Sequence, residues 1–201
     1  MMSKETDKNQ AGDQVVTAYV CMPRPVLRLG SLWVESVQEK HIERIRQWRN
    51  AQMDILRQHT SIAYEEQIIY YQKHIWPDLL KADPKNILVA YMEDDNLIGY
   101  GGLVHIEWEN FKAEVSFLLN PSLLNSPDNY TRYFSVFLQL IKELAFQDLA
   151  LQSLFTETYA LRTHHISILE AMGFARVKIL KNHVKIEDIW VDSIIHICSK
   201  T

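Results

Sequence analysis

Apolar and polar residues alternate with a period of two over residues 97–119, which predicts two antiparallel strands joined by a tight turn. A two-residue turn at Glu109 and Asn110 would fix the register of this hairpin. Counting outward from the turn gives three cross-strand pairs on one face: Glu107 with Lys112, His105 with Glu114, and Leu103 with Ser116. The opposite face is apolar and is expected to join the core: Val104, Ile106, Ala113, Val115 and Phe117.

The remaining periodicity predicts five further strands and four helices. The strands are expected at residues 29–37, 86–92, 154–159, 174–180 and 190–198. The helices are expected at residues 39–50, 64–76 and 130–146, followed by a short one that Thr163 caps and Gly173 ends. This order indicates a mixed α/β (α+β) fold with one central, mostly antiparallel sheet of about seven strands.

Length and composition restrict the class of protein. A chain of 201 residues with 47% hydrophobic residues suits one globular domain, which we expect at residues 26–201 behind a flexible tail and arm at residues 1–25. The net charge of -4, without a basic stripe, argues against nucleic-acid binding, and no apolar run has the length of a membrane span. Two distant cysteines, Cys21 and Cys198, and the lack of a signal peptide favour a cytoplasmic protein. We expect it to be a monomer or a homodimer.

Four histidines raise the question of a metal site: His164, His165, His183 and His196. Adjacent histidines on a helix point in different directions, and no cysteine or aspartate spacing completes a tetrahedral set. We therefore expect no metal.

Three motifs, in this order, resemble those of the GNAT superfamily of acyl-CoA-dependent N-acyltransferases. They are residues 47–50 (QWRN), 97–102 (LIGYGG) and 162–174 (RTHHISILEAMGF), followed by a closing stretch with Asp192 near its end. The third motif resembles the ending N-x-x-S-I-x-x-L-E-x-x-G-F, with Arg162 and His165 in place of Asn and Ser. The most similar branch contains the ribosomal-protein and nucleotide-amino-sugar N-acetyltransferases.

The resemblance implies a GNAT-like sheet flanked by four helices, with acetyl-CoA as cosubstrate. Relatives hold its pyrophosphate in a glycine-rich loop before the long helix, but the matching residues 120–132 (NPSLLNSPDNYTR) contain no glycine. Side chains of Asn125, Ser126 and Asn129 are expected to donate hydrogen bonds there instead, and Arg132 to supply charge. The expected cofactor-binding residues are Leu118, Leu119, Asn129, Arg132, Arg162 and His165. The tyrosine that many relatives use as general acid in the last helix is replaced by Leu169.

The catalytic candidates are Glu114, His105 and Tyr159. An ammonium must lose a proton before its nitrogen can attack, and the carboxylate of Glu114, beside His105, could accept that proton directly or through water. The alternative for this pair is a polar cross-strand contact on a half-solvated sheet. Tyr159 could protonate the departing thiolate, or it could be an ordinary aromatic residue at a strand edge.

The expected acceptor-binding residues come from the first connector and a late strand: Asn50, Gln52, Arg57, Gln58 and Glu157. Arg57 could bind a phosphate or carboxylate of the acceptor. The alternatives are a solvated loop, a helix-capping role for Asn50 and a solvated strand position for Glu157.

These features predict an N-acetyltransferase that moves an acetyl group from acetyl-CoA to a primary amine by direct attack in a ternary complex. The expected acceptor is a small polar molecule such as a nucleotide-linked amino sugar. One alternative is a protein N-acetyltransferase, which needs an open groove. The other is a catalytically silent GNAT-like domain that binds a ligand or partner, an alternative favoured by the glycine-free loop.

Overall fold

The computed structural model describes residues 17–186 and 188–200, so residues 1–16 of the tail and arm expected at residues 1–25 lie outside the described residues. The described chain forms one sheet of eight strands in the order β1-β2-β3-β4-β5-β6-β8-β7. All neighbours in this sheet are antiparallel except β5 and β6, which are parallel. The expected mixed α/β fold on a mostly antiparallel sheet is confirmed. In the described ranges no helix is both long enough and apolar enough to cross a bilayer.

The strands are β1 (Val26–Leu29), β2 (Leu32–Ser36), β3 (Ile87–Glu93), β4 (Asn96–Glu107), β5 (Lys112–Leu119), β6 (Ser153–Tyr159), β7 (Ala175–Ile186) and β8 (Ile189–Ser199). The α-helices are α1 (Glu39–Asn50), α2 (Tyr64–Tyr70), α3 (Pro127–Glu143) and α4 (Thr163–Ala171). Short π-helical segments extend α2 through Ile75 and α3 through Asp148.

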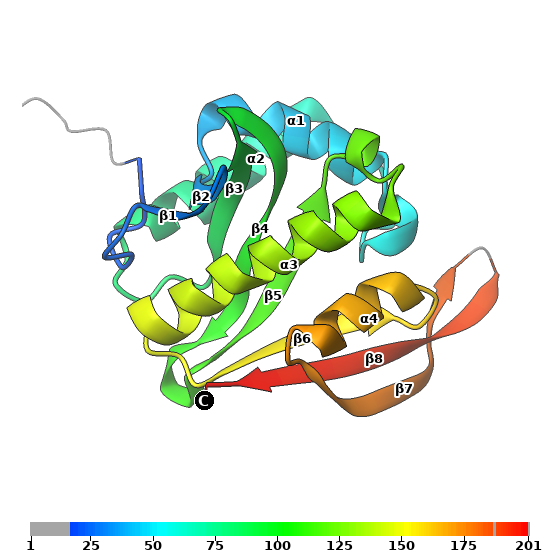
Figure 1. Ribbon diagram of the computed structural model, residues 1–201. Helices are drawn as coiled ribbons and strands as arrows, with labels where there is room; N and C mark the ends of the chain where they lie inside the picture. Colours follow the sequence, from blue (N-terminus) through cyan, green and yellow to red (C-terminus); the bar gives the residue numbers. More distant parts are fainter. Residues whose placement is uncertain (1–16, 187, 201) are drawn as a thin grey trace, which may run out of the picture.

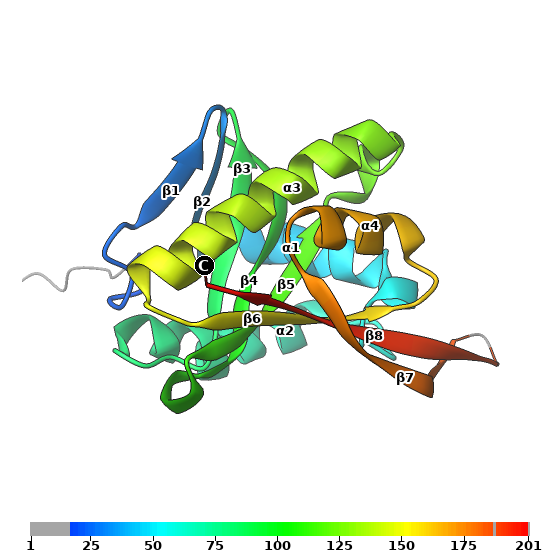
Figure 2. The same ribbon diagram turned by 60° about the horizontal axis from the view of Figure 1, so that its bottom comes forward.

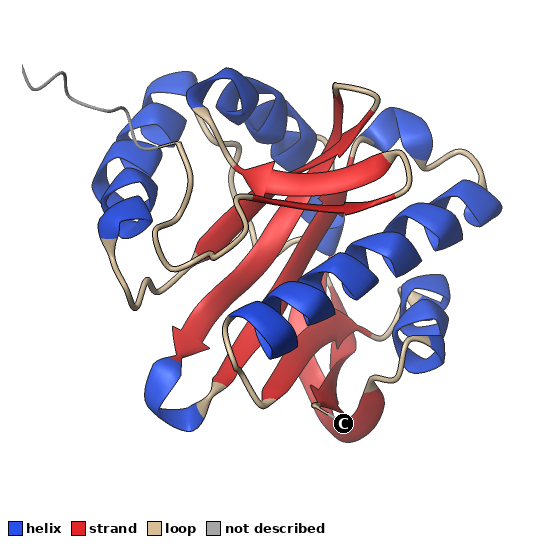
Figure 3. Cartoon of the chain, turned by 60° about the vertical axis from the view of Figure 1, so that its left-hand side comes forward, coloured by secondary structure: helices blue, strands red, loops and turns tan. Residues whose placement is uncertain are grey.

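Helices cover both faces of the sheet, with α3 across one face and α1 and α2 on the other (Figures 1 and 3). Strand β3 explains why residues 87–92 are apolar without interruption. Its odd-numbered residues join the core that includes α3, and its even-numbered residues join the core that includes α1. A strand buried on both faces needs apolar side chains at every position.

Three local predictions differ from the structure. The single strand expected at residues 29–37 is the hairpin β1–β2, which turns at Gly30 with a φ of 63°. The second helix is α-helical only to Tyr70. It then continues as a π-helical segment and ends in a 3₁₀ turn around Pro77. Thr163 does not cap α4; it is the first helical residue, and the N-cap position belongs to Arg162.

The central hairpin keeps its predicted charge pair but not the rest of its register. Glu107 lies opposite Lys112, as expected. A bulge at His105, whose φ is 50°, then inserts one extra residue into β4. Glu114 therefore lies opposite Val104 instead of His105, and Leu103 lies opposite Val115 instead of Ser116. The bulge also moves Val104 from the expected apolar face to the face that carries Glu114.

The parallel pairing of β5 with β6 is short. It contains three residue pairs and ends at Glu114 opposite Phe155. Beyond this point β6 stays paired with β8 as far as Tyr159, and β8 pairs with β7 in a long ribbon (Figure 2). Strand β5 stays paired with β4 as far as Leu119. The sheet therefore opens between β5 and β6, and this opening positions the site.

Gly102→Ala should lower the free energy of unfolding by more than about 2 kcal/mol. Gly102 has a φ of 129°, and a Cβ there would lie 2.0 Å from the carbonyl oxygen of Ile87. Strands β3 and β4 would have to move apart to accept the methyl group. Urea unfolding at equilibrium measures the loss.

The control for this substitution is Gly30→Ala. Gly30 also has a positive φ, 63°, but a Cβ there would meet nothing within 4 Å. It should cost only about 1 kcal/mol, from backbone conformation alone. Equal losses at the two positions would contradict a role for close strand contact at Gly102.

Candidate active site

A cavity of about 620 Å³ lies where β5 and β6 diverge. On one side its wall includes Arg57 from the connector between α1 and α2, together with Glu114. On the other side its wall includes Phe134 from α3 and His165 from α4. Because the lining comes from both faces of the sheet, the cavity passes through the gap between the two strands.

A second cavity of about 270 Å³ adjoins the first and shares Ile55, Phe117, Arg162 and His165 with it. It is bounded by the end of β5, with Leu118 and Leu119, and by the first residues of α3 and α4. The expected cofactor residues Leu118, Leu119, Arg162 and His165 thus all line this second cavity.

The edge of β5 that faces this space has no partner strand beyond Glu114. The N–H of Asn120 donates to the carbonyl of Ile98 in β4, so the backbone groups of Leu119 point to the opposite edge. There the carbonyl of Leu119 accepts a hydrogen bond from Nε2 of Gln52 at 2.9 Å. By the alternation of a strand, Val115 and Phe117 have their backbone groups on this same edge, and the pairing with β6 ends beside Val115, at Glu114 opposite Phe155. An open strand edge can pair with an extended chain that carries amides.

Glu114 is the buried carboxylate of the larger cavity, with a residue exposure of 4%. Its Oε1 forms an ion pair with Nη2 of Arg57, whose side chain is half-exposed. Its Oε2 lies 3.8 Å from Nε2 of His105. The structure thus brings Glu114 and His105 together across the bulge, with His105 at the exposed rim of the cavity.

Glu157 is a second carboxylate beside the same guanidinium. Nη1 of Arg57 lies 3.9 Å from Oε2 of Glu157, and Nδ1 of His183 lies 3.0 Å from Oε1. Arg57 therefore bridges two glutamates on β5 and β6, on either side of the gap. This arrangement neutralises one of their two negative charges.

Tyr159 lies at the end of β6, is buried and lines the larger cavity. Burial raises the pKa of its phenol above the ordinary value. The phenol therefore keeps its proton at neutral pH, as a group that later donates this proton must do.

Tyr130, Arg162 and His165 form a cluster between α3 and α4. The hydroxyl of Tyr130 lies 2.7 Å from Nδ1 of His165, and Nη2 of Arg162 donates to the same hydroxyl at 3.2 Å. Burial, and then the nearby guanidinium of Arg162, hold the pKa of His165 well below its usual value. His165 is therefore neutral near pH 7, and Arg162 is the positive charge of this cluster.

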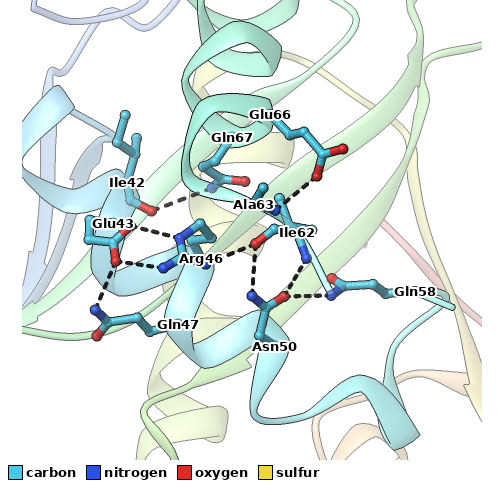
Figure 4. A network of polar contacts seen from close by, with 10 residues as sticks. All are labelled: Ile42, Glu43, Arg46, Gln47, Asn50, Gln58, Ile62, Ala63, Glu66 and Gln67. Carbon is cyan, nitrogen blue, oxygen red and sulfur yellow. Dashed lines mark hydrogen bonds and ion pairs between the residues drawn. The ribbon is translucent and has the colours of Figure 1, made fainter. Parts of the chain in front are cut away.

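Three of the expected acceptor-binding residues instead hold the connector in place. Asn50 makes two hydrogen bonds to the backbone of Ile62, each of 2.9 Å (Figure 4). Its Nδ2 donates to the Ile62 carbonyl, and its Oδ1 accepts from the Ile62 N–H. Gln58 donates to Oδ1 of Asn50 at 2.9 Å (Figure 4). Gln52 is buried and bonds to Leu119, as described above. Of the connector residues predicted to bind the acceptor, Arg57 is the one whose side chain reaches the larger cavity's carboxylates.

The structure does not bring Arg132 to either of these cavities. Its Nη2 donates to Oε1 of Glu93 at the end of β3, at 2.8 Å. Asn129 uses its backbone N–H to bond Oγ of Ser126, the N-cap of α3, at 3.4 Å. Asn120 makes a similar turn, accepting from the N–H of Ser122 at 3.1 Å. Side-chain caps thus organise this glycine-free loop.

The sequence reasoning gave no role to several residues of the larger cavity, among them Arg49 and Thr156. Arg49 belongs to the QWRN motif but received no role of its own. Thr156 lies on β6, and its Oγ1 is buried without a hydrogen-bond partner in the described chain. No sequence signal distinguishes this threonine from other strand residues. Within the described ranges, no three histidine, cysteine, aspartate or glutamate side chains gather as metal ligands would.

Comparison with solved structures shows what this fold resembles. The spermidine N-acetyltransferase of Vibrio cholerae, in complex with CoA and spermine, matches with a TM-score of 0.73 and 17% identity, over 85% of this chain and 96% of that chain. A dodecameric structure of the same enzyme in an intermediate state matches with a TM-score of 0.72 and 15% identity, over 85% of this chain and 95% of that chain. A probable acetyltransferase matches with a TM-score of 0.66 and 16% identity, over 87% of this chain and 97% of that chain. Curated protein sequences gave no significant match.

Comparison with sequence families supplies the remaining evidence. A family model described as an acetyltransferase (GNAT) domain matches residues 34–195, which is most of the chain. The match spans α1 and α2, the opening between β5 and β6, and most of β8. The protein therefore belongs to the GNAT acetyltransferase family, which confirms the expected enzyme class, an acyl-CoA-dependent N-acyltransferase.

Proposed function

We propose that this protein transfers the acetyl group of acetyl-CoA to the primary amine of a small polar acceptor, with both substrates meeting between β5 and β6. The observation that carries this proposal is the cavity through the sheet, with the buried carboxylate of Glu114 in its wall. Residues from both faces of the sheet line the cavity, an arrangement that suits two substrates approaching from opposite sides.

The donor side is the smaller cavity with the free edge of β5. The pantetheine arm of acetyl-CoA is an extended chain with two amides, which suits the open edge of β5 at Val115 and Phe117. Arg162 is the positive charge at the mouth of this cavity and suits a pyrophosphate. It takes the role that the sequence reasoning gave to Arg132.

The acceptor side is the part of the larger cavity under the α1–α2 connector. Glu114 accepts a proton from the incoming ammonium, directly or through water, and His105 at the rim orients the carboxylate. The amine nitrogen then attacks the thioester carbonyl, the C–S bond breaks, and Tyr159 protonates the departing sulfur. The nitrogen loses its second proton to the resulting phenolate, directly or through water, which completes the amide and restores Tyr159. Neither Cys21 nor Cys198 lines the cavities, which supports direct transfer without an acyl-cysteine.

Three acceptor classes remain to be compared. A nucleotide-linked amino sugar is the acceptor expected from the sequence, through the branch that the motifs resemble. A polyamine is a candidate because the Vibrio cholerae structure contains spermine and because Glu114 and Glu157 form a carboxylate pair here. A protein substrate needs an open groove. The enclosing connector, held by Asn50, supports a small molecule.

Glu114→Gln should reduce kcat at neutral pH at least about a hundredfold, because the amide cannot accept the proton. The KM for acetyl-CoA should change little, since the carboxylate is not on the donor side. Part of the loss should return at alkaline pH, where the amine arrives already neutral. Steady-state kinetics from pH 7 to pH 10, at roughly unit intervals, measures all three effects.

The matched control is Glu109→Gln, an exposed carboxylate at the turn of the same hairpin. It should leave kcat unchanged. Near-wild-type turnover in Glu114→Gln would exclude Glu114 as the base. If the wild-type protein acetylated no amine in a broad panel, the silent binding domain would become the better interpretation.

Arg162→Gln should lower kcat/KM for acetyl-CoA about tenfold, by removing a charged hydrogen bond to phosphate. The same substitution should not change kcat/KM for S-acetylpantetheine, an acetyl donor that carries no phosphate. Arg132→Gln is the matched comparison, because its guanidinium pairs with Glu93, and it should change neither value by more than about twofold. A larger effect at Arg132 than at Arg162 would place the phosphates where the sequence alone suggested.

A further inference from the structure

Arg49 differs from the other arginine of the acceptor side in having no negative partner. It lies at the C-terminal end of α1 and lines the larger cavity. Its Nη1 donates to the hydroxyl of Tyr100 at 2.7 Å, and its Nε donates to Oε1 of Gln58 at 3.0 Å. Both partners are neutral. Among the described residues, no carboxylate lies within 4 Å of its guanidinium, whereas Arg57 bridges Glu114 and Glu157.

Arg49 also lines a neighbouring cavity of about 420 Å³ between α2 and the sheet. One carboxylate, that of Glu66, borders this cavity. Oε2 of Glu66 accepts a hydrogen bond from the backbone N–H of Ala63, at 2.8 Å, and so caps α2 (Figure 4). Arg49 therefore lines two cavities, and no described carboxylate in either one forms an ion pair with it.

A half-buried guanidinium without a counter-ion is costly, because it gives up part of its hydration and receives no charge in return. A guanidinium has five N–H donors in a planar fork, and Tyr100 and Gln58 use two of them here. The remaining donors can bind the two oxygens of a carboxylate or phosphate side by side. The hydrogen bonds to Tyr100 and Gln58 also hold the Arg49 side chain in one orientation before any ligand arrives.

We propose that Arg49 binds an acidic group of the acceptor, so that the acceptor is a small primary amine that also carries a carboxylate or a phosphate. The amine end lies at Glu114, an assignment that rests on the proposed function. Arg57, which the sequence suggested for the acid, is already neutralised by the two glutamates. The acid end therefore goes to Arg49, the guanidinium on this side of the cavity that has no carboxylate partner among the described residues.

Two matched pairs of acceptors test this assignment. 4-Aminobutyrate and butylamine differ by a carboxylate, and glucosamine 6-phosphate and glucosamine differ by a phosphate. Putrescine, which carries a second amine and no acid, represents the polyamines. Each compound is tested in two ways with the full chain: by thermal shift, which needs no turnover, and by kcat/KM with acetyl-CoA.

Three variants complete the experiment. Arg49→Gln removes the charge and keeps a donor for its neighbours. Arg49→Lys keeps the charge but loses the fork. Arg44→Gln is the matched control, since it makes the same change of charge at an exposed position on the same helix.

The wild-type protein should prefer one acid-bearing amine over its plain partner by about tenfold or more in kcat/KM. Arg49→Gln should abolish this preference by raising KM for the acid-bearing amine alone, Arg49→Lys should keep part of it, and Arg44→Gln should keep all of it. Whichever pair responds identifies the acid as a carboxylate or a phosphate. Stabilisation by the acid-bearing amine should depend on Arg49 in the same way.

Two outcomes would overturn the proposal. The first is a wild-type protein that prefers putrescine or the plain amines. The second is an equal loss for both members of each pair in Arg49→Gln, which would mean that Arg49 only supports Tyr100 and Gln58. Stabilisation that depends on Arg49, without turnover of any amine, would instead uphold the acid site and contradict the proposed acetyl transfer.

Discussion

The backbone hydrogen bonds between β5 and β6 end at Glu114, and the rest of the site depends on this early end. Each strand has a stronger partner on its other side, since β5 follows β4 to Leu119 and β6 follows β8 to Tyr159. Each half of the sheet therefore keeps its own pairing where the two strands diverge. The opening leaves backbone groups of β5 free on one edge and places the ends of both strands around one cavity.

Charge inside this opening is arranged in two separate groups. On the side of α1 and α2, Arg57 joins Glu114 and Glu157 across the gap, and Arg49 faces the same cavity without a carboxylate. On the side of α3 and α4, Arg162 remains charged beside a neutral His165. The first group suits an acceptor with an amine and an acid, and the second suits the phosphates of the donor. The network around Asn50 fixes the connector that carries Arg57.

Strong periodicity made most of the fold predictable. Helix α1 has the predicted bounds, and the long apolar repeat of α3 and the buried strand β3 were found because their patterns repeat over many residues. The register of the hairpin failed at His105, since a bulge with a left-handed residue that is not glycine leaves no clear mark in a sequence. The roles of Arg49, Arg57 and Arg132 could not be read from residue type, because they depend on which carboxylate each one meets.

A crystal structure of this protein with CoA tests the central claim most directly. The account predicts that the pantetheine arm lies along Val115 and Phe117 on the free edge of β5, with its sulfur in the gap near Tyr159 and its pyrophosphate beside Arg162. Binding of CoA outside the gap between β5 and β6, or closure of that gap by pairing of the two strands, would contradict it.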